Sequence, residues 1–253
     1  MASHSESPER PDVSLTSKSI ESEFGEVFWR TAQNTAYEYL KQVIAGVPRN
    51  RQVYITEEEV TSALGLSRTP IREAMGRLAR ERLLDRIPGR GTMVPKLSDD
   101  DVLRLLEARA LLESWAGTLL AIQPQDPTVD LRGHLRQQQT LTNDPAAFLV
   151  SDRQFHHAIV GSAGNALLTE FYEMQRNRQA RVGLQVLLQV EGRARTVLDE
   201  HQAIVEAIAN HDAIATIRAT SAHLEATLRV LGIHGDHMLI NPFRAAHMEG
   251  LAK

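Results

Sequence analysis

The 253-residue sequence contains no cysteine, which excludes a disulfide framework, a thiolate metal site and a cysteine nucleophile. It also lacks any apolar run that is long enough to cross a membrane. Residues 1–30 are polar and have no apolar core of the kind that a secretion signal needs. We therefore expect a cytoplasmic protein that has no membrane partner and that starts with a polar extension over residues 1–30.

The net charge of −4 is unevenly distributed along the chain. Residues 31–96 contain eleven Lys and Arg against seven Asp and Glu, a net charge of +4, whereas residues 97–253 contain fourteen against nineteen, a net charge of −5. The hydrophobic content of 42% and the charged content of 24% are typical of a globular protein. A basic segment followed by an acidic one favours a DNA-binding domain joined to a domain with another task.

Residues 64–73, Leu-Gly-Leu-Ser-Arg-Thr-Pro-Ile-Arg-Glu, are the most informative part of the sequence. Gly65 is suited to end one helix at a tight turn. Ser67 can cap the next helix, because its hydroxyl can accept a hydrogen bond from a free backbone N–H. Pro70 is tolerated in the first turn of that helix. The segment therefore predicts a helix, a tight turn and a second helix.

Arg68, Thr69 and Arg72 lie near the N-terminus of this second helix, where a recognition helix contacts bases and phosphates. Two arginines four residues apart are, by themselves, more typical of a solvated surface helix. The surroundings favour DNA binding, because a short amphipathic helix over residues 56–64 precedes the turn. The apolar residues of the second helix recur at helical spacing: Ile71, Met75 and Leu78.

Residues 86–94 predict a short strand, a glycine-containing turn and a second strand. This hairpin carries two arginines and is therefore basic. A basic hairpin that follows a helix-turn-helix is typical of a wing. Residues 31–96 are accordingly expected to form a winged helix-turn-helix domain of three helices and a β-hairpin wing.

Residues 35–96 resemble the winged helix-turn-helix domain of the GntR family of bacterial transcription regulators. Residues 67–74 match the recognition-helix motif of that family almost residue for residue, and the hairpin lies where the family has its wing. Departures from the family are Arg82 in place of a common glycine, Pro48-Arg49 in place of a Pro-Gly pair, and the acidic run at residues 57–59. The resemblance implies DNA contacts for five residues: Ser67, Arg68, Thr69, Arg72 and Gly91.

From Ser98 onward the sequence has almost no strand signal and strong helical periodicity. Six helices joined by short polar breaks predict an antiparallel α-helical bundle over residues 97–232. The predicted helices cover residues 98–124, 128–141, 145–164, 165–187, 193–210 and 212–231. Residues 233–253 are expected to form a C-terminal tail. The fold class is therefore mostly α, with the winged domain followed by the bundle.

Asp152 and His156 are four residues apart and so share one face of a predicted helix. His201 and His223 lie on the inward sides of two later helices. Three imidazoles and one carboxylate inside a bundle form a ligand set that suits a borderline divalent metal such as zinc, nickel or manganese. For any one histidine, a hydrogen-bonded position in the core is the simpler interpretation.

The combination of residues 152–156, 163–165, 200–201 and His223 resembles the FCD ligand-binding domain of the FadR subfamily of GntR regulators. The resemblance covers about residues 99–231. It implies that one divalent metal ion, zinc by first choice and nickel or manganese as alternatives, is coordinated by four residues: Asp152, His156, His201 and His223.

Arg109 lies on the first predicted helix of the bundle and points toward the interior. A buried arginine needs an anion, and its planar guanidinium matches a carboxylate. Two partners are open, an internal salt bridge with Glu113 or a small organic acid that acts as effector. The family resemblance favours the effector.

We therefore predict a transcription regulator and not an enzyme. Its affinity for double-stranded operator DNA would be controlled by a small carboxylate metabolite bound at the metal site. A homodimer is expected, because one winged helix reads only a half-site. Two alternatives stay open. One is a metal-dependent hydrolase, since His211-Asp212 resembles the pair of HD-type phosphohydrolases, and the other is a regulator whose metal is purely structural.

Overall fold

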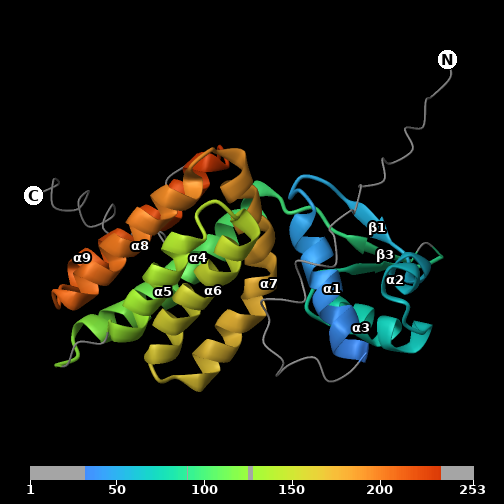
Figure 1. Ribbon diagram of the computed structural model, residues 1–253, viewed down its shortest axis with the longest axis horizontal. Coiled ribbons are helices and arrows are strands. Elements are labelled where there is room, and N and C mark those ends of the chain that lie inside the picture. The colour runs from blue at the N-terminus through green and yellow to red at the C-terminus, as the bar shows by residue number, and fades with distance from the viewer. Residues whose placement is uncertain (1–31, 90, 125–127, 235–253) are drawn as a thin grey trace, which may run out of the picture. The chain divides into compact units, whose positions relative to one another are not determined.

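The computed structural model (Figure 1) describes three stretches of the chain: residues 32–89, 91–124 and 128–234. Contacts within the chain divide it into two compact units, which meet in sequence between Lys96 and Leu97. The predicted polar extension, and all but the first two residues of the predicted C-terminal tail, lie outside the described residues. The described residues are mostly helical, which confirms the predicted fold class.

In its described residues the first unit contains three helices and a small antiparallel sheet, which confirms the predicted winged helix-turn-helix. Its strands are ordered β1-β3-β2, so the hairpin of β2 and β3 is the predicted wing. The third strand, β1, was not predicted, because it pairs with β3 from a distant part of the sequence and has no adjacent turn and partner strand to mark it. The elements are α1 (Ala32–Gly46), β1 (Val53–Ile55), α2 (Glu57–Leu64), α3 (Arg68–Arg80), β2 (Asp85–Ile87) and β3 (Gly91–Val94).

The turn between α2 and α3 has the predicted glycine but lacks the predicted hydrogen bond. Gly65 ends α2 with a φ of 65°, in the left-handed region that glycine adopts without a steric penalty. Ser67 is the N-cap residue of α3, yet its hydroxyl accepts no capping hydrogen bond from the described backbone. The prediction of that bond is wrong, because the third residue of α3 is Pro70, which has no N–H to donate.

The first helix of the motif, α2, begins at a capping box that the sequence analysis missed. The backbone N–H of Thr56 donates to the Glu59 carboxylate at 2.8 Å, and the backbone N–H of Glu59 donates to the Thr56 hydroxyl at 3.2 Å. This reciprocal pair satisfies two of the N–H groups that a helix N-terminus leaves without partners. One of the three acidic residues of α2, Glu59, therefore stabilises the start of this helix.

After α3, the backbone of Arg82 adopts a φ of 56°. A left-handed conformation costs an ordinary L-residue roughly 1–2 kcal/mol, whereas glycine avoids this cost. Arg82 therefore occupies a turn position that favours glycine, the residue from which the sequence analysis found it to depart.

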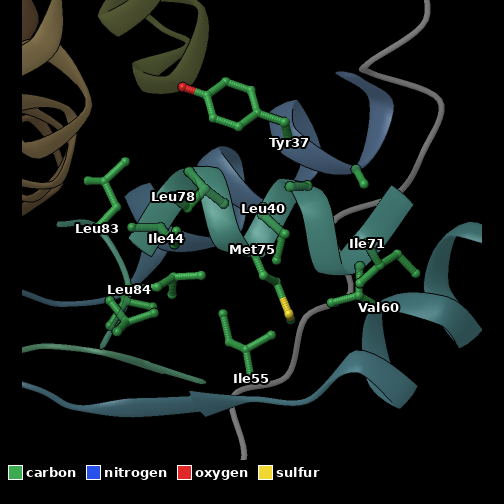
Figure 2. Packing of buried hydrophobic residues seen from close by; sticks show 14 residues of the cluster. Tyr37, Leu40, Ile44, Ile55, Val60, Ile71, Met75, Leu78, Leu83 and Leu84 are labelled. Carbon is green, nitrogen blue, oxygen red and sulfur yellow. The ribbon is translucent and has the colours of Figure 1, made fainter. Parts of the chain in front are cut away.

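One apolar core holds the first unit together (Figure 2). Figure 2 shows α1 and α3 packed through Leu40, Ile44, Met75 and Leu78, with Ile55 of β1 on the sheet side. Burial of each such side chain contributes about 1.5–3 kcal/mol. The core occupies one face of α3, so the N-terminal turn and the opposite face of that helix are left exposed to solvent.

The second unit contains six helices in its described residues, and each lies within a few residues of its predicted range. Neighbouring helices pack along one another, notably α4 with α9, α8 with α9 and α6 with α7. This confirms the predicted helical bundle. The helices are α4 (Asp99–Ala121), α5 (Val129–Thr140), α6 (Pro145–Ser162), α7 (Ala166–Gln189), α8 (Arg193–Ala209) and α9 (Ala213–Val230).

Side-chain caps explain where several of these helices begin. Ser98 and Asp101 form a capping box at the start of α4, and Asn165 accepts from a backbone N–H at the start of α7. Asp212 caps α9 by accepting from the N–H of Ala215 at 2.8 Å. His211 lies in the loop before α9, with Nδ1 at 3.0 Å from the carbonyl oxygen of Ala121. Both members of the His211-Asp212 pair therefore have a structural role, since His211 contacts the end of α4 and Asp212 caps α9.

The bundle has two apolar clusters with polar groups between its helices. One cluster includes Leu112, Phe155 and Ile204, and the other includes Leu106 and Leu224. Among the helices that the structure describes, none combines the length and the apolar character that a membrane span requires. The polar residues that are buried between the helices are the candidates for a functional site.

Candidate functional site

Three histidines from different helices meet inside the second unit. His156 of α6, His201 of α8 and His223 of α9 are all buried. One ring nitrogen of each lies within 4.8 Å of those of the other two. Phe155 stacks on the ring of His201 with the ring centroids 4.3 Å apart, which restricts how that imidazole can turn. Residues that are far apart in the sequence thus form one compact cluster.

Asp152, the fourth predicted ligand, lies beside this cluster. Its Oδ1 is 3.8 Å from Nε2 of His156 and 3.5 Å from Nε2 of His201. Its side chain is 19% exposed, so it lies nearer to solvent than the imidazoles do. The structure therefore brings together all four residues that the sequence analysis singled out.

Each imidazole of the cluster turns its Nδ1 toward an acceptor oxygen on another residue. Carboxylates can only accept, so the hydrogen bond to Glu200 assigns the ring proton of His223 to Nδ1, which leaves its Nε2 lone pair available. Sequence reasoning missed these outer partners, because two of them lie on helices that contribute no histidine. The pairs are His156 with Glu113 at 3.0 Å, His201 with Gln138 at 3.0 Å and His223 with Glu200 at 2.8 Å.

The environment favours the neutral form of two of the imidazoles. Burial lowers the pKa of His201 well below its usual value, and the neighbouring His156 lowers it further. Burial also lowers the pKa of His223, although its hydrogen bond to Glu200 acts in the opposite direction. A metal ion binds the neutral form of histidine. His201 and His223 are therefore held in the protonation state that metal coordination requires.

The donor atoms of the cluster fit a metal ion. Nε2 of His156 and Nε2 of His201 are buried and make no hydrogen bond within the described part of the chain. Nδ1 of His156 also lacks one, although Oε2 of Glu113 lies 3.0 Å away. A buried polar atom without a partner costs about 1–3 kcal/mol, which a coordinated cation would offset. Two ligands with metal–nitrogen bonds of about 2.1 Å lie at most about 4.2 Å apart, so small side-chain shifts would close the cluster round one ion. The three histidines are a candidate metal site.

Glu113 joins this cluster to Arg109. The Glu113 side chain is only 1% exposed, and it accepts from Nε of Arg109 at 2.7 Å and from the hydroxyl of Tyr172 at 2.8 Å. Burial alone would raise the pKa of Glu113, but Arg109 and His156 hold it below its usual value. Glu113 is therefore ionised, and Arg109 makes the internal salt bridge that the sequence analysis gave as one of two alternatives.

Arg109 also lines two small cavities, each of about 30 Å³. That volume has room for roughly two water molecules. One cavity reaches His223, and the other reaches His156, Arg153 and Arg176. The two cavities share five lining residues: Arg109, Leu149, Asp152, Gln179 and Gly183. The cavities adjoin the histidine cluster and are lined by arginines, two of which the sequence analysis did not identify.

The predicted DNA-contacting residues of the first unit are exposed. Ser67, Arg68 and Thr69 lie at the N-terminal end of α3, and Gly91 begins β3 with a φ of 93°. Arg72 lies one turn further along α3, with 63% of its side chain exposed. A cationic helix terminus and a hairpin that is exposed near its turn are features of a winged helix that binds DNA.

Two family models match the chain. The model "Bacterial regulatory proteins, gntR family" matches residues 32–94, and the model "FCD domain" matches residues 104–226. The "Probable D-xylose utilization operon transcriptional repressor" of Paenarthrobacter nicotinovorans is 28% identical over 181 residues, which are 69% of this chain and 77% of the relative. The "Gluconate operon transcriptional repressor" of Bacillus subtilis is 23% identical over 199 residues, which are 75% of this chain and 80% of the relative.

The fold is also similar to that of a solved structure. The structure of E. coli McbR/YncC superposes with a TM-score of 0.66 at 18% sequence identity, covering 80% of this chain and 98% of that one. At this identity the likeness concerns the fold alone. The matched family and its relatives are transcription regulators and not enzymes. The chain belongs to the GntR family of DNA-binding bacterial transcription regulators and carries an FCD domain as its second part.

Proposed function

We propose that this regulator binds its operator with an affinity that is set by a small carboxylate bound beside a metal ion in the FCD domain. The observation that carries the proposal is the pair of buried Nε2 atoms of His156 and His201, which make no hydrogen bond with the described residues. Beside this pair, His156 and His223 line cavities that Arg109 also lines. Ring nitrogens without partners favour a cation, and a buried arginine favours an anion.

The metal would be held by Asp152, His156, His201 and His223. Zinc is our first choice, and nickel and manganese also suit three imidazoles and one carboxylate. When bound, the ion supplies a Lewis acid to which a carboxylate oxygen can coordinate. The protein's own contribution is to place an acceptor oxygen of Glu113, Gln138 or Glu200 beside Nδ1 of each imidazole, which helps to orient the rings.

The effector would be a small carboxylate that enters the cavities and meets Arg109. Each cavity has room for only about two water molecules in this structure, so a larger acid would enter only if the side chains that line the cavities move apart. The names of two relatives concern operons for D-xylose utilization and gluconate, so sugar-derived acids are the first carboxylates to test. Arg109 would keep its salt bridge to Glu113 and offer the rest of its guanidinium to the acid.

The DNA contacts would come from the N-terminal turns of α3 and from the wing. Arg68 and Arg72 would meet base edges and phosphates, with Ser67, Thr69 and Gly91 close to the backbone of the DNA. We further propose a homodimer that acts in the cytoplasm, because one winged helix reads a half-site and a two-fold protein matches a near-palindromic operator. The effector would then favour one arrangement of the dimer, and DNA another.

Thermal melting with and without metal tests this proposal. The full-length protein would be stripped with EDTA, reloaded with zinc, and melted with a panel of small carboxylates that includes gluconate. We expect zinc to raise the melting temperature, and one of the acids to raise it further only when zinc is present. The same acid should change the affinity for DNA. If zinc stabilises the protein but no acid alters melting or DNA binding, the metal is structural.

A conservative variant tests the role of Arg109. Arg109→Lys keeps a positive charge beside Glu113 but loses the planar guanidinium that binds carboxylates. We expect the affinity for the active acid to fall about tenfold or more, while the melting temperature without acid changes little. Arg104→Lys, on the exposed side of the same helix, is the matched control. Equal acid affinity in both variants would contradict a role for Arg109 in effector binding.

A further inference from the structure

The acidic run of α2 lies at the start of a helix that belongs to a DNA-binding motif. Of its three carboxylates, Glu59 caps α2 and Glu58 is exposed. Glu57 has a different role, because both of its carboxylate oxygens lie 2.8 Å from Nε of Arg72 on α3. The salt bridge thus joins the first helix of the motif to the N-terminal part of the second.

We infer that Glu57 is a positioning residue that determines how selectively Arg72 binds DNA. The carboxylate would hold the guanidinium of Arg72 in one orientation and oppose its binding to a phosphate. The inference rests on the DNA-contact role proposed above for Arg72, and it goes beyond that role by assigning a specificity device to an acidic residue.

The geometry leaves Arg72 able to contact a base. Arginine has five N–H donors, and the contact with Glu57 uses the one on Nε. The two terminal nitrogens are the ones that pair with O6 and N7 of guanine in the major groove. Glu57 contacts Nε of Arg72, so it can orient the guanidinium while the donors on the end and the opposite edge of the group stay available for a base.

Electrostatics distinguishes the two kinds of DNA contact. A phosphate is an anion, so it is repelled by Glu57 when it approaches Arg72, whereas the edge of a base pair is neutral. Arginine contacts to phosphate contribute affinity without sequence information, while contacts to bases provide discrimination. A carboxylate fixed beside Arg72 therefore weakens the contact of Arg72 with phosphate, which every DNA sequence provides. It preserves the contact with a base edge, which only some sequences provide.

Glu57→Gln tests this inference, with Glu58→Gln as the charge-matched control. Full-length proteins would be titrated by fluorescence anisotropy against two duplexes over a range of salt concentrations. One duplex is selected from a randomised pool with the wild-type protein, and the other is a scrambled duplex of the same composition. Thermal melting of each variant checks that the fold is retained.

We expect Glu57→Gln to bind the scrambled duplex several-fold more tightly, because Arg72 becomes free to meet a phosphate. The slope of log affinity against log salt for that duplex should steepen by about one, the value for one added phosphate contact. Discrimination between the duplexes should fall about tenfold, as for the loss of one base contact. Glu58→Gln should shift both duplexes alike.

Arg72→Ala separates the two ways in which the experiment can fail. If this variant binds both duplexes as the wild type does, Arg72 does not contact DNA, and the proposed contact set is wrong. If Arg72→Ala loses affinity for the selected duplex while Glu57→Gln matches Glu58→Gln in slope and discrimination, then Glu57 does not control Arg72 and the inference is overturned.

Discussion

At the scale of single residues, two adjacent histidines of α6 have opposite environments. His156 is buried in the cluster, whereas 38% of the His157 side chain is exposed and its Nε2 lies 2.8 Å from Glu173. Only the four-residue spacing from Asp152 distinguishes His156 in the sequence, because that spacing puts the two side chains on one face of the helix.

This pair provides a direct test of the metal site. His156→Asn removes a proposed ligand with an orphaned Nε2, so we expect zinc affinity to fall more than about a hundredfold, beyond the effect typical of an outer partner. His157→Asn changes the same residue type one position away and should leave zinc affinity unchanged. Competition against a chromogenic chelator measures both. Equal losses in the two variants would show that the cluster is not the zinc site.

The sequence predicts individual positions well where the evidence is local, and less well where a neighbouring residue changes the chemistry. Gly65 ends α2 as expected, since its left-handed backbone is a property of the turn itself. The capping bond of Ser67 fails because Pro70, three residues on, has no N–H. For Arg109, the sequence leaves open whether the partner is Glu113 or an organic acid. The salt bridge to Glu113 and the position of Arg109 beside the cavities both depend on how the bundle packs.

At the scale of elements, helix boundaries were predictable because caps and apolar spacing are local signals. Ser98, Asn165 and Asp212 each mark the start of a helix in the sequence and cap it in the structure. The outer partners of the histidines were not predictable in the same way. Glu113 lies on α4 and Gln138 on α5, and neither helix contributes a histidine to the cluster. Only the packing of the bundle brings these two side chains to it.

The contact between α5 and α8 leads to a prediction about one of these partners. Gln138→Met keeps the volume of a fully buried side chain but removes the acceptor that faces Nδ1 of His201. We expect zinc affinity to fall about 10–100-fold, as for other outer partners of metal ligands. Gln139→Met, at the exposed neighbouring position, is the control. If isothermal titration gives both variants wild-type affinity, the hydrogen bond does not orient His201 for metal binding.

At the scale of the whole molecule, the proposed homodimer can be tested with DNA of two designs. We expect light scattering to give twice the chain mass of 28.2 kDa. A duplex with two half-sites should bind more tightly than a duplex with one by about a hundredfold or more, because the second contact becomes intramolecular. A protein that stays monomeric at micromolar concentration and binds both duplexes equally would contradict the dimer.

One buried carboxylate has a consequence for the behaviour of the regulator as a whole. Glu113 touches both the arginine of the cavities and a histidine of the metal cluster. In the proposed function, an acid that shares the guanidinium with Glu113 would leave this carboxylate more negative charge for the imidazole, since the same anion contacts both. Thermodynamic reciprocity then requires the cation to change the affinity for the acid by the same factor as the acid changes the affinity for the cation. Cells poor in the proposed metal would then respond weakly to the proposed metabolite, and the genetic output would depend on two kinds of nutrient supply.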